Sequence, residues 1–230
     1  LESAVLILSM RRRIVLIEGE ILILFLLFLI ALLYSSVGHG GASGYLAILS
    51  LTIYAEYDSG WLKQHAWALN LVVAAVAFYY YRKAGFFNFD LTFPFLLSSV
   101  PFAIIGGYLK VDGAFYDTIL SITLVWAAYK LLQVKEIYST IEFQVPSLRY
   151  AVPIGGGIGL MSGIIGVGGG IFLSPILLLK KWADPKTAAA TAALFIWVNS
   201  MAGLVGAGIS GQLVIQMDIL FPFVIAVLLG

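Results

Sequence analysis

The sequence predicts an all-α membrane protein: a polytopic helical bundle of two inverted repeats, each with a glycine-broken helix pair at the membrane midplane. Three observations predict this fold class: a very apolar composition, two charge-free runs too long for one straight helix, and an internal repeat. Of the 230 residues, 61% are apolar and 11% are charged, whereas roughly a quarter are charged in an ordinary soluble domain. So few charges cannot cover a surface that faces water, and we expect the lipid bilayer around most of the chain.

The charged residues are clustered, and the runs between them are long enough to cross the membrane. A helix needs about 20 residues to cross roughly 30 Å of hydrocarbon. Lipid offers no water to unpaired backbone groups, and the runs lack strict alternation, so we expect helices and not a barrel. Spans are predicted over residues 21–55, 64–81, 91–109, 150–179 and 187–217, with weaker candidates at 118–129 and 219–230.

Two of these runs must be interrupted. As straight helices, the 35 residues of 21–55 and the 30 residues of 150–179 would be roughly 45 to 52 Å long, which exceeds the hydrocarbon core. Each run contains one glycine cluster, Gly38-His39-Gly40-Gly41 or Gly166-Val167-Gly168-Gly169-Gly170. Because glycine weakens a helix and tolerates unusual backbone angles, the helix is expected to stop at each cluster.

The two clusters also mark an internal repeat. A shift of 128 residues places Gly38, Gly40 and Gly41 on Gly166, Gly168 and Gly169. After one extra residue Asn70 falls on Asn199, and Pro94 then falls on Pro222. The first unit would hold the two halves of its broken run and spans near 64–81, 91–109 and 114–132. That odd number of segments inverts the next unit, as in many secondary transporters.

This reading divides the chain into four parts. Residues 1–20 form an N-terminal segment, in which 1–9 are read as a tag or leader because Met10 and three arginines resemble a natural start. Residues 21–132 form the first transmembrane repeat, and 133–149 form a polar linker. Residues 150–230 form the second repeat, which is expected to be incomplete because it lacks a counterpart of 114–132.

A helix broken inside the membrane has backbone groups that must be buried in protein or line a wet cavity. Glycines let successive amides point into one concavity, and the following helix adds its positive end, so each break predicts an anion cradle. The alternative is that these glycines only permit close helix packing. The candidate substrate-binding residues are Gly38, His39, Gly40, Gly41, Ser43, Asn70, Gly166, Gly168, Gly169, Gly170 and Asn199.

The polar candidates each allow two interpretations. His39 is either a proton acceptor or anion donor, or a neutral imidazole bonded to a carbonyl. Ser43 either reaches substrate or bonds back to its own helix. Asn70 and Asn199 either line the substrate path or join helices. No carboxylate lies in a predicted span core, so coupling to protons would depend on His39 or on protonation of the substrate.

Several classes of function are disfavoured. The chain has no cysteine, which excludes disulfides, thiolate metal sites and cysteine nucleophiles. The basic residues are scattered, so no nucleic-acid partner is expected; nor is a metal, a cofactor or a particular oligomeric state. Gly41-Ala42-Ser43-Gly44 matches the motif of an intramembrane serine protease, but the two histidines of the chain are His39 and His65, and neither lies on a late span after the serine to serve as its base. A passive anion channel stays open as the second alternative.

Two segments resemble the duplicated glycine motif of the TauE/SafE family of sulfite exporters. They are Ser35-Ser36-Val37-Gly38-His39-Gly40-Gly41 and the stretch from Ser162 to Pro175, and the first departs from the motif by having Ala42 in place of a glycine. The resemblance covers most of the chain after residue 21. It implies a secondary transporter, not an enzyme, that moves sulfite, thiosulfate or an organosulfonate by alternating access across a bacterial inner membrane.

Overall fold

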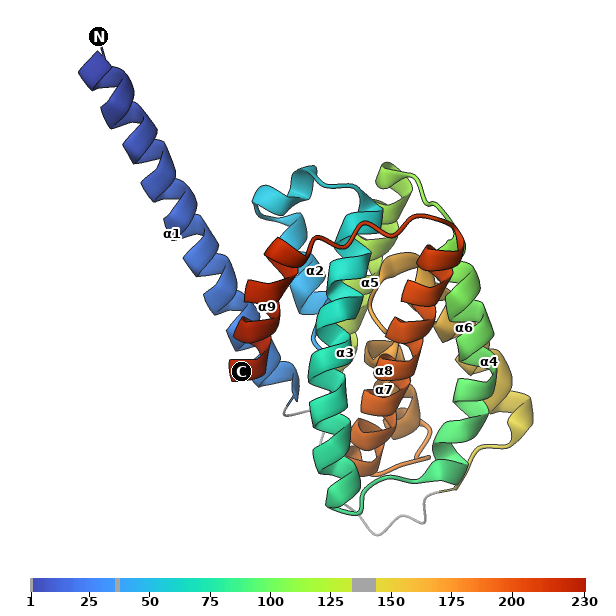
Figure 1. Ribbon diagram of the computed structural model, residues 1–230. Coiled ribbons are helices and arrows are strands. Elements are labelled where there is room, and N and C mark those ends of the chain that lie inside the picture. Colours follow the sequence, from blue (N-terminus) through green and yellow to red (C-terminus); the bar gives the residue numbers. More distant parts are fainter. Residues whose placement is uncertain (1, 36–37, 134–143) are drawn as a thin grey trace.

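The computed structural model describes residues 2–35, 38–133 and 144–230, and every regular element in these ranges is helical (Figure 1). The all-α class predicted from the sequence is therefore confirmed for the described part of the chain. In order, the elements are α1 (Glu2–Ser35), α2 (Ala42–Ser50), a short 3-10 turn η1 (Ile53–Glu56), α3 (Ser59–Lys83), α4 (Phe89–Tyr108), α5 (Gly113–Gln133), α6 (Leu148–Ile165), α7 (Gly170–Leu179), α8 (Pro185–Ile209) and α9 (Met217–Leu229).

The boundaries expected between the four parts of the chain do not all coincide with the ends of helices. The boundary expected after residue 20 lies inside α1, whose first part projects away from the bundle in Figure 1. The expected linker, 133–149, falls mostly on residues 134–143, which lie outside the described residues. The second half then begins with α6 at Leu148.

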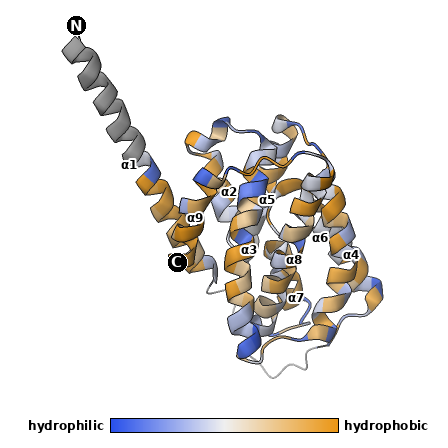
Figure 2. Cartoon of the chain, viewed as in Figure 1, coloured by the Kyte–Doolittle hydropathy of each residue, from blue (hydrophilic) through white to orange (hydrophobic). Residues whose placement is uncertain are grey.

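Among the described residues, α4, α6 and α8 are long and apolar enough to cross a membrane. Shorter apolar helical stretches cover Gly19–Ser35, Gly113–Trp126, Gly170–Leu179 and Met217–Leu229. Figure 2 shows hydrophobic residues along the helices and hydrophilic ones mainly near the ends of the bundle. The chain is thus an integral membrane protein whose outer faces suit lipid.

Helix α3 covers the span predicted at 64–81, but it is less apolar than these three helices and is not among them. Its polar side chains explain the difference. Gln64, His65 and Asn70 are each 0% exposed, so they face the interior and not lipid. Helix α3 therefore lies at the centre of the bundle and carries polar groups inward.

Helices α3 and α8 correspond to each other in length and in how they begin. Each has 25 residues and starts after an aspartate that caps its N-terminus. The Asp58 carboxylate accepts from Trp61 N at 2.7 Å, and that of Asp184 accepts from Lys186 N at 2.9 Å and Thr187 N at 3.1 Å. The two helices pack together and run in opposite directions (Figure 1).

The two halves of the chain interlock. Helix α4 of the first half packs against α6 and α8 of the second, and α9 of the second half packs against α1 and α3 of the first. The α4–α6 contact is close because α6 presents glycines to it. A Cβ on Gly155 or Gly159 would meet the backbone of Phe95 or Ser99 on α4. Small residues at such spacing are typical of tightly packed membrane helices.

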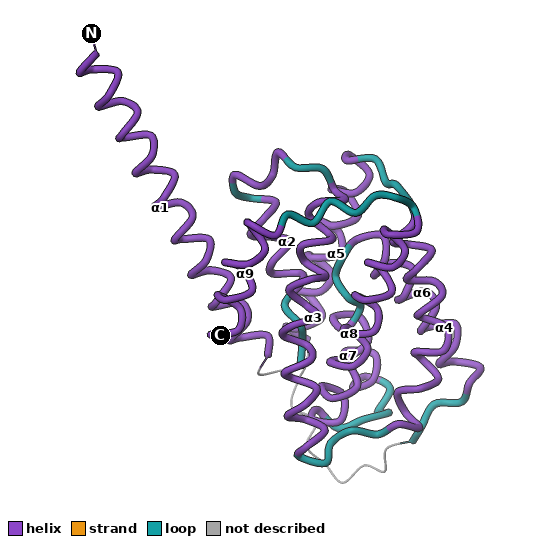
Figure 3. The backbone as a smooth tube through the Cα atoms, viewed as in Figure 1, coloured by secondary structure: helices purple, strands orange, loops and turns teal. Residues whose placement is uncertain are grey.

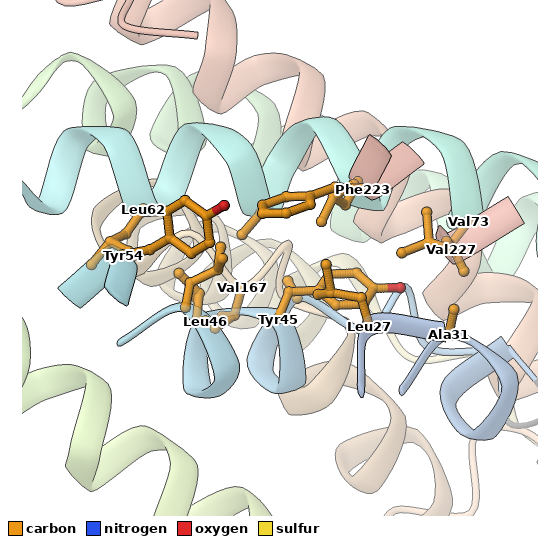
Figure 4. Packing of buried hydrophobic residues seen from close by; sticks show 14 of the residues in the cluster. Leu27, Ala31, Tyr45, Leu46, Tyr54, Leu62, Val73, Val167, Phe223 and Val227 are labelled. Carbon is orange, nitrogen blue, oxygen red and sulfur yellow. The ribbon is translucent and has the colours of Figure 1, made fainter. Parts of the chain in front are cut away.

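An apolar cluster joins the first half to α9 and to the second glycine segment (Figure 4). Val167, which lies between α6 and α7, is 4% exposed and belongs to this cluster. The other labelled members are Leu27, Ala31, Tyr45, Leu46, Tyr54, Leu62, Val73, Phe223 and Val227. The second glycine segment is therefore anchored inside the bundle, against helices of the other half.

Candidate functional site

Both glycine clusters lie between helices. Helix α1 ends at Ser35 and α2 begins at Ala42, and α6 ends at Ile165 and α7 begins at Gly170. In Figure 3, stretches of loop lie among the helices as well as at the two ends of the bundle. Gly41 (φ 90°) and Gly169 (φ 83°) occupy the N-cap positions of α2 and α7 in the left-handed conformation. Only glycine adopts this conformation without strain, so the two short helices start in the same way.

The two clusters meet at the side chain of Asn70, which is 0% exposed at mid-length of α3. A Cβ built on Gly40 would lie 2.5 Å from Asn70 Oδ1, and one built on Gly168 would lie 2.7 Å from Asn70 Nδ2. Both would also crowd Ile196 Cγ2 of α8, at 2.8 and 2.9 Å. One glycine from each half of the sequence therefore touches the same buried amide.

Asn70 is only partly satisfied by protein. Its Nδ2 donates to Ser200 Oγ on α8 at 3.2 Å, and its Oδ1 is buried without a hydrogen-bond partner among the described residues. A serine hydroxyl both donates and accepts, so rotation of the Asn70 amide by half a turn preserves the bond to Ser200 and turns the NH2 group toward Gly40. In that orientation the NH2 group of Asn70 can donate to a ligand while the amide oxygen accepts from Ser200.

The backbone amides around Asn70 are also available. His39 N donates to Tyr34 O at 2.9 Å and Gly166 N donates to Ser162 O at 2.9 Å. Within the described ranges, the amides of Gly40, Gly168 and Gly169 donate to no backbone carbonyl. Buried amides are nearly always paired in proteins, so unused donors beside an unused amide side chain point to a polar ligand.

Asn199, which the repeat aligns with Asn70, bonds within its own helix and not to Asn70. Its Nδ2 donates to Phe195 O of its own helix at 2.8 Å, and its buried Oδ1 has no partner among the described residues. The residue that meets Asn70 is the next one, Ser200. Successive residues of a helix point about 100° apart, so one position decides which side chain faces α3. A role for Asn199 in binding stays a prediction.

His39 and Ser43 gather around Tyr34, near the end of α1. The rings of His39 and Tyr34 are 6.3 Å apart at 87°, and Ser43 Oγ donates to Tyr34 Oη at 3.4 Å. In this hydrogen bond the Ser43 hydroxyl therefore donates neither to the backbone of its own helix nor to a histidine. The sequence did not single out Tyr34, because a tyrosine near the end of an apolar helix is ordinarily an interfacial residue.

The remaining glycines pack against one face of α8. A Cβ on Gly38 would lie 2.5 Å from Ala189 Cβ, one on Gly169 would lie 2.7 Å from Phe195, and one on Gly170 would meet Ile196. Gly166 instead packs against Lys63 and Gly41 against Tyr45. Close packing, the alternative offered by the sequence, is therefore present at both glycine segments.

Two large cavities lie toward opposite ends of α3. The Lys63 cavity, of about 850 Å³, is lined near the start of α3 by Asp58 and Lys63 and beyond it by Lys110 and Tyr116. The Tyr80 cavity, of about 730 Å³, is lined by residues 73–84 of α3 and by the end of α9. Asn70 lies between these two stretches of α3. In the described part of the chain, no three metal-ligating side chains gather.

Comparisons with known proteins agree with the resemblance in the glycine motifs. Residues 23–230 match the model of a family described as Sulfite exporter TauE/SafE. Probable membrane transporter protein y4hK of Sinorhizobium fredii (strain NBRC 101917 / NGR234) is 35% identical over 184 residues, which cover 78% of this chain and 73% of that protein. A search of solved structures found no match.

Proposed function

Because this chain belongs to the TauE/SafE family of sulfite exporters, we propose that it moves a small sulfur-containing oxyanion by alternating access. Sulfite, thiosulfate and organosulfonates are the substrates that we assign to it, and a bacterial inner membrane is the location. The observation that carries the proposal is the meeting of Gly40 and Gly168 on Asn70. Two unwound segments at one buried amide form the kind of site that broken helices build in secondary transporters.

An inverted repeat is supported by matched features of the two halves. Gly41 and Gly169 are left-handed N-caps of α2 and α7, and Pro94 and Pro222 lie inside α4 and α9. Helices α3 and α8 run in opposite directions, as do α4 and α9 (Figure 1). The packing of α4 on α6 and α8 has its counterpart in the packing of α9 on α1 and α3. These relations are those expected of two units related by a two-fold axis in the membrane plane.

The anion would be held mainly by hydrogen-bond donors. Backbone amides of Gly40, Gly168 and Gly169 and the NH2 group of Asn70 provide donors from both halves, and Ser200 provides a hydroxyl. An ion that leaves water loses strong hydration, and several donors in a dry site are needed to replace it. A site without a fixed positive charge releases the anion readily, which suits a transporter better than a storage protein.

Alternating access is supported by the position of the cavities. The Lys63 and Tyr80 cavities approach the same helix from opposite ends, and the glycine segments between them are closely packed. In the proposed cycle, the glycine segments part from α8 on one side at a time. Because the glycines lack Cβ atoms, the contact area that must separate in each step is small.

His39 is the proton-coupling residue that we assign. It is 7% exposed, lies within the first glycine segment and stacks edge-on against Tyr34. Histidine is the side chain that proteins ordinarily use to transfer protons near neutral pH. A passive channel, the alternative, would need no such group. The protease alternative gains nothing from Ser43, whose hydroxyl donates to Tyr34.

Flux into proteoliposomes tests the proposal. Purified protein is reconstituted, and uptake of labelled sulfite, thiosulfate, sulfoacetate and sulfate is measured with and without an imposed pH gradient. We expect saturable uptake of at least one of the first three anions and stimulation by the gradient, which His39→Gln abolishes. Uptake that is linear in concentration and indifferent to the gradient would favour the channel. No uptake of any sulfur anion would refute the assigned substrate class.

A further inference from the structure

A buried ammonium group lines the Lys63 cavity. Lys63 is 3% exposed, although lysine is almost never fully buried unless it has a partner. Its Nζ donates to Leu109 O at 3.3 Å and lies 5.7 Å from the centre of the Trp67 ring. Both partners are uncharged, so they stabilise the ammonium without neutralising it.

Lys63 also touches the second glycine segment. A Cβ built on Gly166 would lie 2.6 Å from Lys63 Cβ. Tyr116, which lines the same cavity, donates its hydroxyl to Ile165 O at 3.0 Å. The cavity is therefore bounded by side chains that contact residues 165 and 166, at the point where α6 ends and the glycine segment begins.

The carboxylates of the cavity offset this charge only in part, and Asp58 is the one that attracts the Lys63 ammonium. Asp58, Asp112 and Asp117 also line it, but all three are exposed. Exposed charges interact weakly because water screens them, whereas a charge in a low-dielectric interior acts strongly on an ion that comes within a few ångströms. Asp58 is in addition occupied in capping α3 through Trp61 N. The deepest charge of the cavity is thus positive.

We propose that Lys63 is the anion-recruiting and specificity-determining residue of the transporter. When an oxyanion enters the Lys63 cavity, the Lys63 ammonium exchanges its hydrogen bond to Leu109 O for one to the anion. The anion then passes along Gly166 to the donors around Asn70. The ammonium makes the cavity selective for anions over neutral solutes of the same size. This inference rests on the proposed function, because it assigns the path to the same site.

The absence of cysteine from the chain allows a direct test. Lys63→Cys is reconstituted, and saturable sulfite or thiosulfate uptake is measured before and after alkylation of the thiol with 2-bromoethylamine, which adds an ammonium, or bromoethane, which adds a neutral group. Both reagents form a thioether with loss of bromide, and sulfite does not cleave a thioether as it would a disulfide. We expect KM to rise about tenfold in the variant, the factor that one lost charge-assisted contact is worth. The charged reagent should restore most of this loss and the neutral one none of it. Lys110→Cys, in the same cavity but exposed, should change KM less than twofold.

A second variant guards against misfolding. Lys63→Gln keeps a donor for Leu109 O and removes only the charge, so a merely structural role predicts normal KM for it. We expect the same rise in KM as for Lys63→Cys, with an unchanged melting temperature in detergent. Wild-type KM in Lys63→Gln, or equal rescue by both reagents, would overturn the role of Lys63 and leave the proposed function intact. If the unmodified protein moved no sulfur anion at all, the proposed function would fail first and this inference with it.

Discussion

Asn70 on α3 donates to the hydroxyl of Ser200 on α8 at 3.2 Å, and this bond links the two halves of the chain beside the glycine segments. Gly168 lies against both partners, since a Cβ on it would be 2.7 Å from Asn70 Nδ2 and 3.1 Å from Ser200 Oγ. The position of the Asn70 amide is therefore set jointly by a helix of each half. Substitution of any one of these three residues should therefore alter the contacts of the other two.

Ser200→Ala should lower both stability and affinity. The substitution leaves the buried NH2 group of Asn70 without its partner, which costs about 1 to 3 kcal/mol, and it frees the amide from its orientation. Chemical denaturation in detergent and titration with sulfite measure the two effects. Ser210→Ala at the end of the same helix is the control, because its hydroxyl bonds only to Ala207 O of α8, and it should be near neutral. Equal effects of both substitutions would contradict the coupling.

Gly168→Ala should abolish transport. Gly168 has φ of 70°, where alanine is strained by about 1 kcal/mol or more, and the added Cβ would clash with Asn70 and Ile196. Uptake into proteoliposomes and the melting temperature should both fall. Gly157→Ala is the matched control, since nothing lies within 4 Å of a Cβ at that position. A Gly168→Ala protein with normal uptake would show that the close contact with Asn70 is unimportant.

Gln64 fastens the connection between α8 and α9 to the start of α3. Its Nε2 donates to Gln212 O at 2.6 Å and its Oε1 accepts from Val214 N at 2.8 Å. Gln64→Leu should destabilise the protein by about 2 kcal/mol, because it removes two hydrogen bonds that are partly shielded from water. Amide exchange at Val214 should become faster. The control is Gln212→Ala, because the Gln212 side chain is partly exposed and bonds only Tyr108 O, so its loss should matter little. Unchanged amide exchange at Val214 in Gln64→Leu would contradict the role of Gln64 in holding this connection.

Asp184 gives the protein a pH dependence on the acidic side. Burial opposes ionisation, but hydrogen bonds from Thr187 and Lys186 outweigh it and lower the pKa of the Asp184 carboxyl below its ordinary value of 3.8. A lowered folded-state pKa means that the stabilisation is present above the unfolded pKa and is lost as pH falls through the folded one.

The matching experiment compares wild type with Asp184→Asn and Asp184→Ala. Asparagine keeps an N-cap without titrating, so the difference in melting temperature between wild type and Asp184→Asn should shrink as pH is lowered from 5 toward 3. Alanine should cost about 1 kcal/mol near neutral pH through loss of the cap. A difference between wild type and Asp184→Asn that stays constant over this pH range would argue against the shifted carboxyl.

The helical class and the positions of the two glycine clusters between helices were predictable because their signals are local. Charge-free length and glycine content are read directly from consecutive residues, and the structure starts α2 and α7 at Ala42 and Gly170. Family membership was likewise predictable from the second glycine motif, which is long and specific.

The composition of the site was less predictable because it depends on contacts between distant residues. The repeat shows that Asn70 and Asn199 are equivalent positions, but it does not indicate that Asn70 bonds Ser200, the next residue on α8. Lys63 lies just before the predicted span at 64–81 and was not singled out in the sequence, and only its packing on Gly166 and its bond to Leu109 O reveal its burial. Neither contact leaves a sign in the residues beside it.

Locating a bound anion tests the central claim most directly. The protein is crystallised with thiosulfate, and the anomalous signal of sulfur is used to place the ion. We predict that the ion lies within hydrogen-bond distance of the Asn70 amide and of backbone amides from both glycine segments, and that Asn70→Leu removes it. An ion bound elsewhere, with the two glycine segments unchanged and still packed against Asn70, would contradict the account.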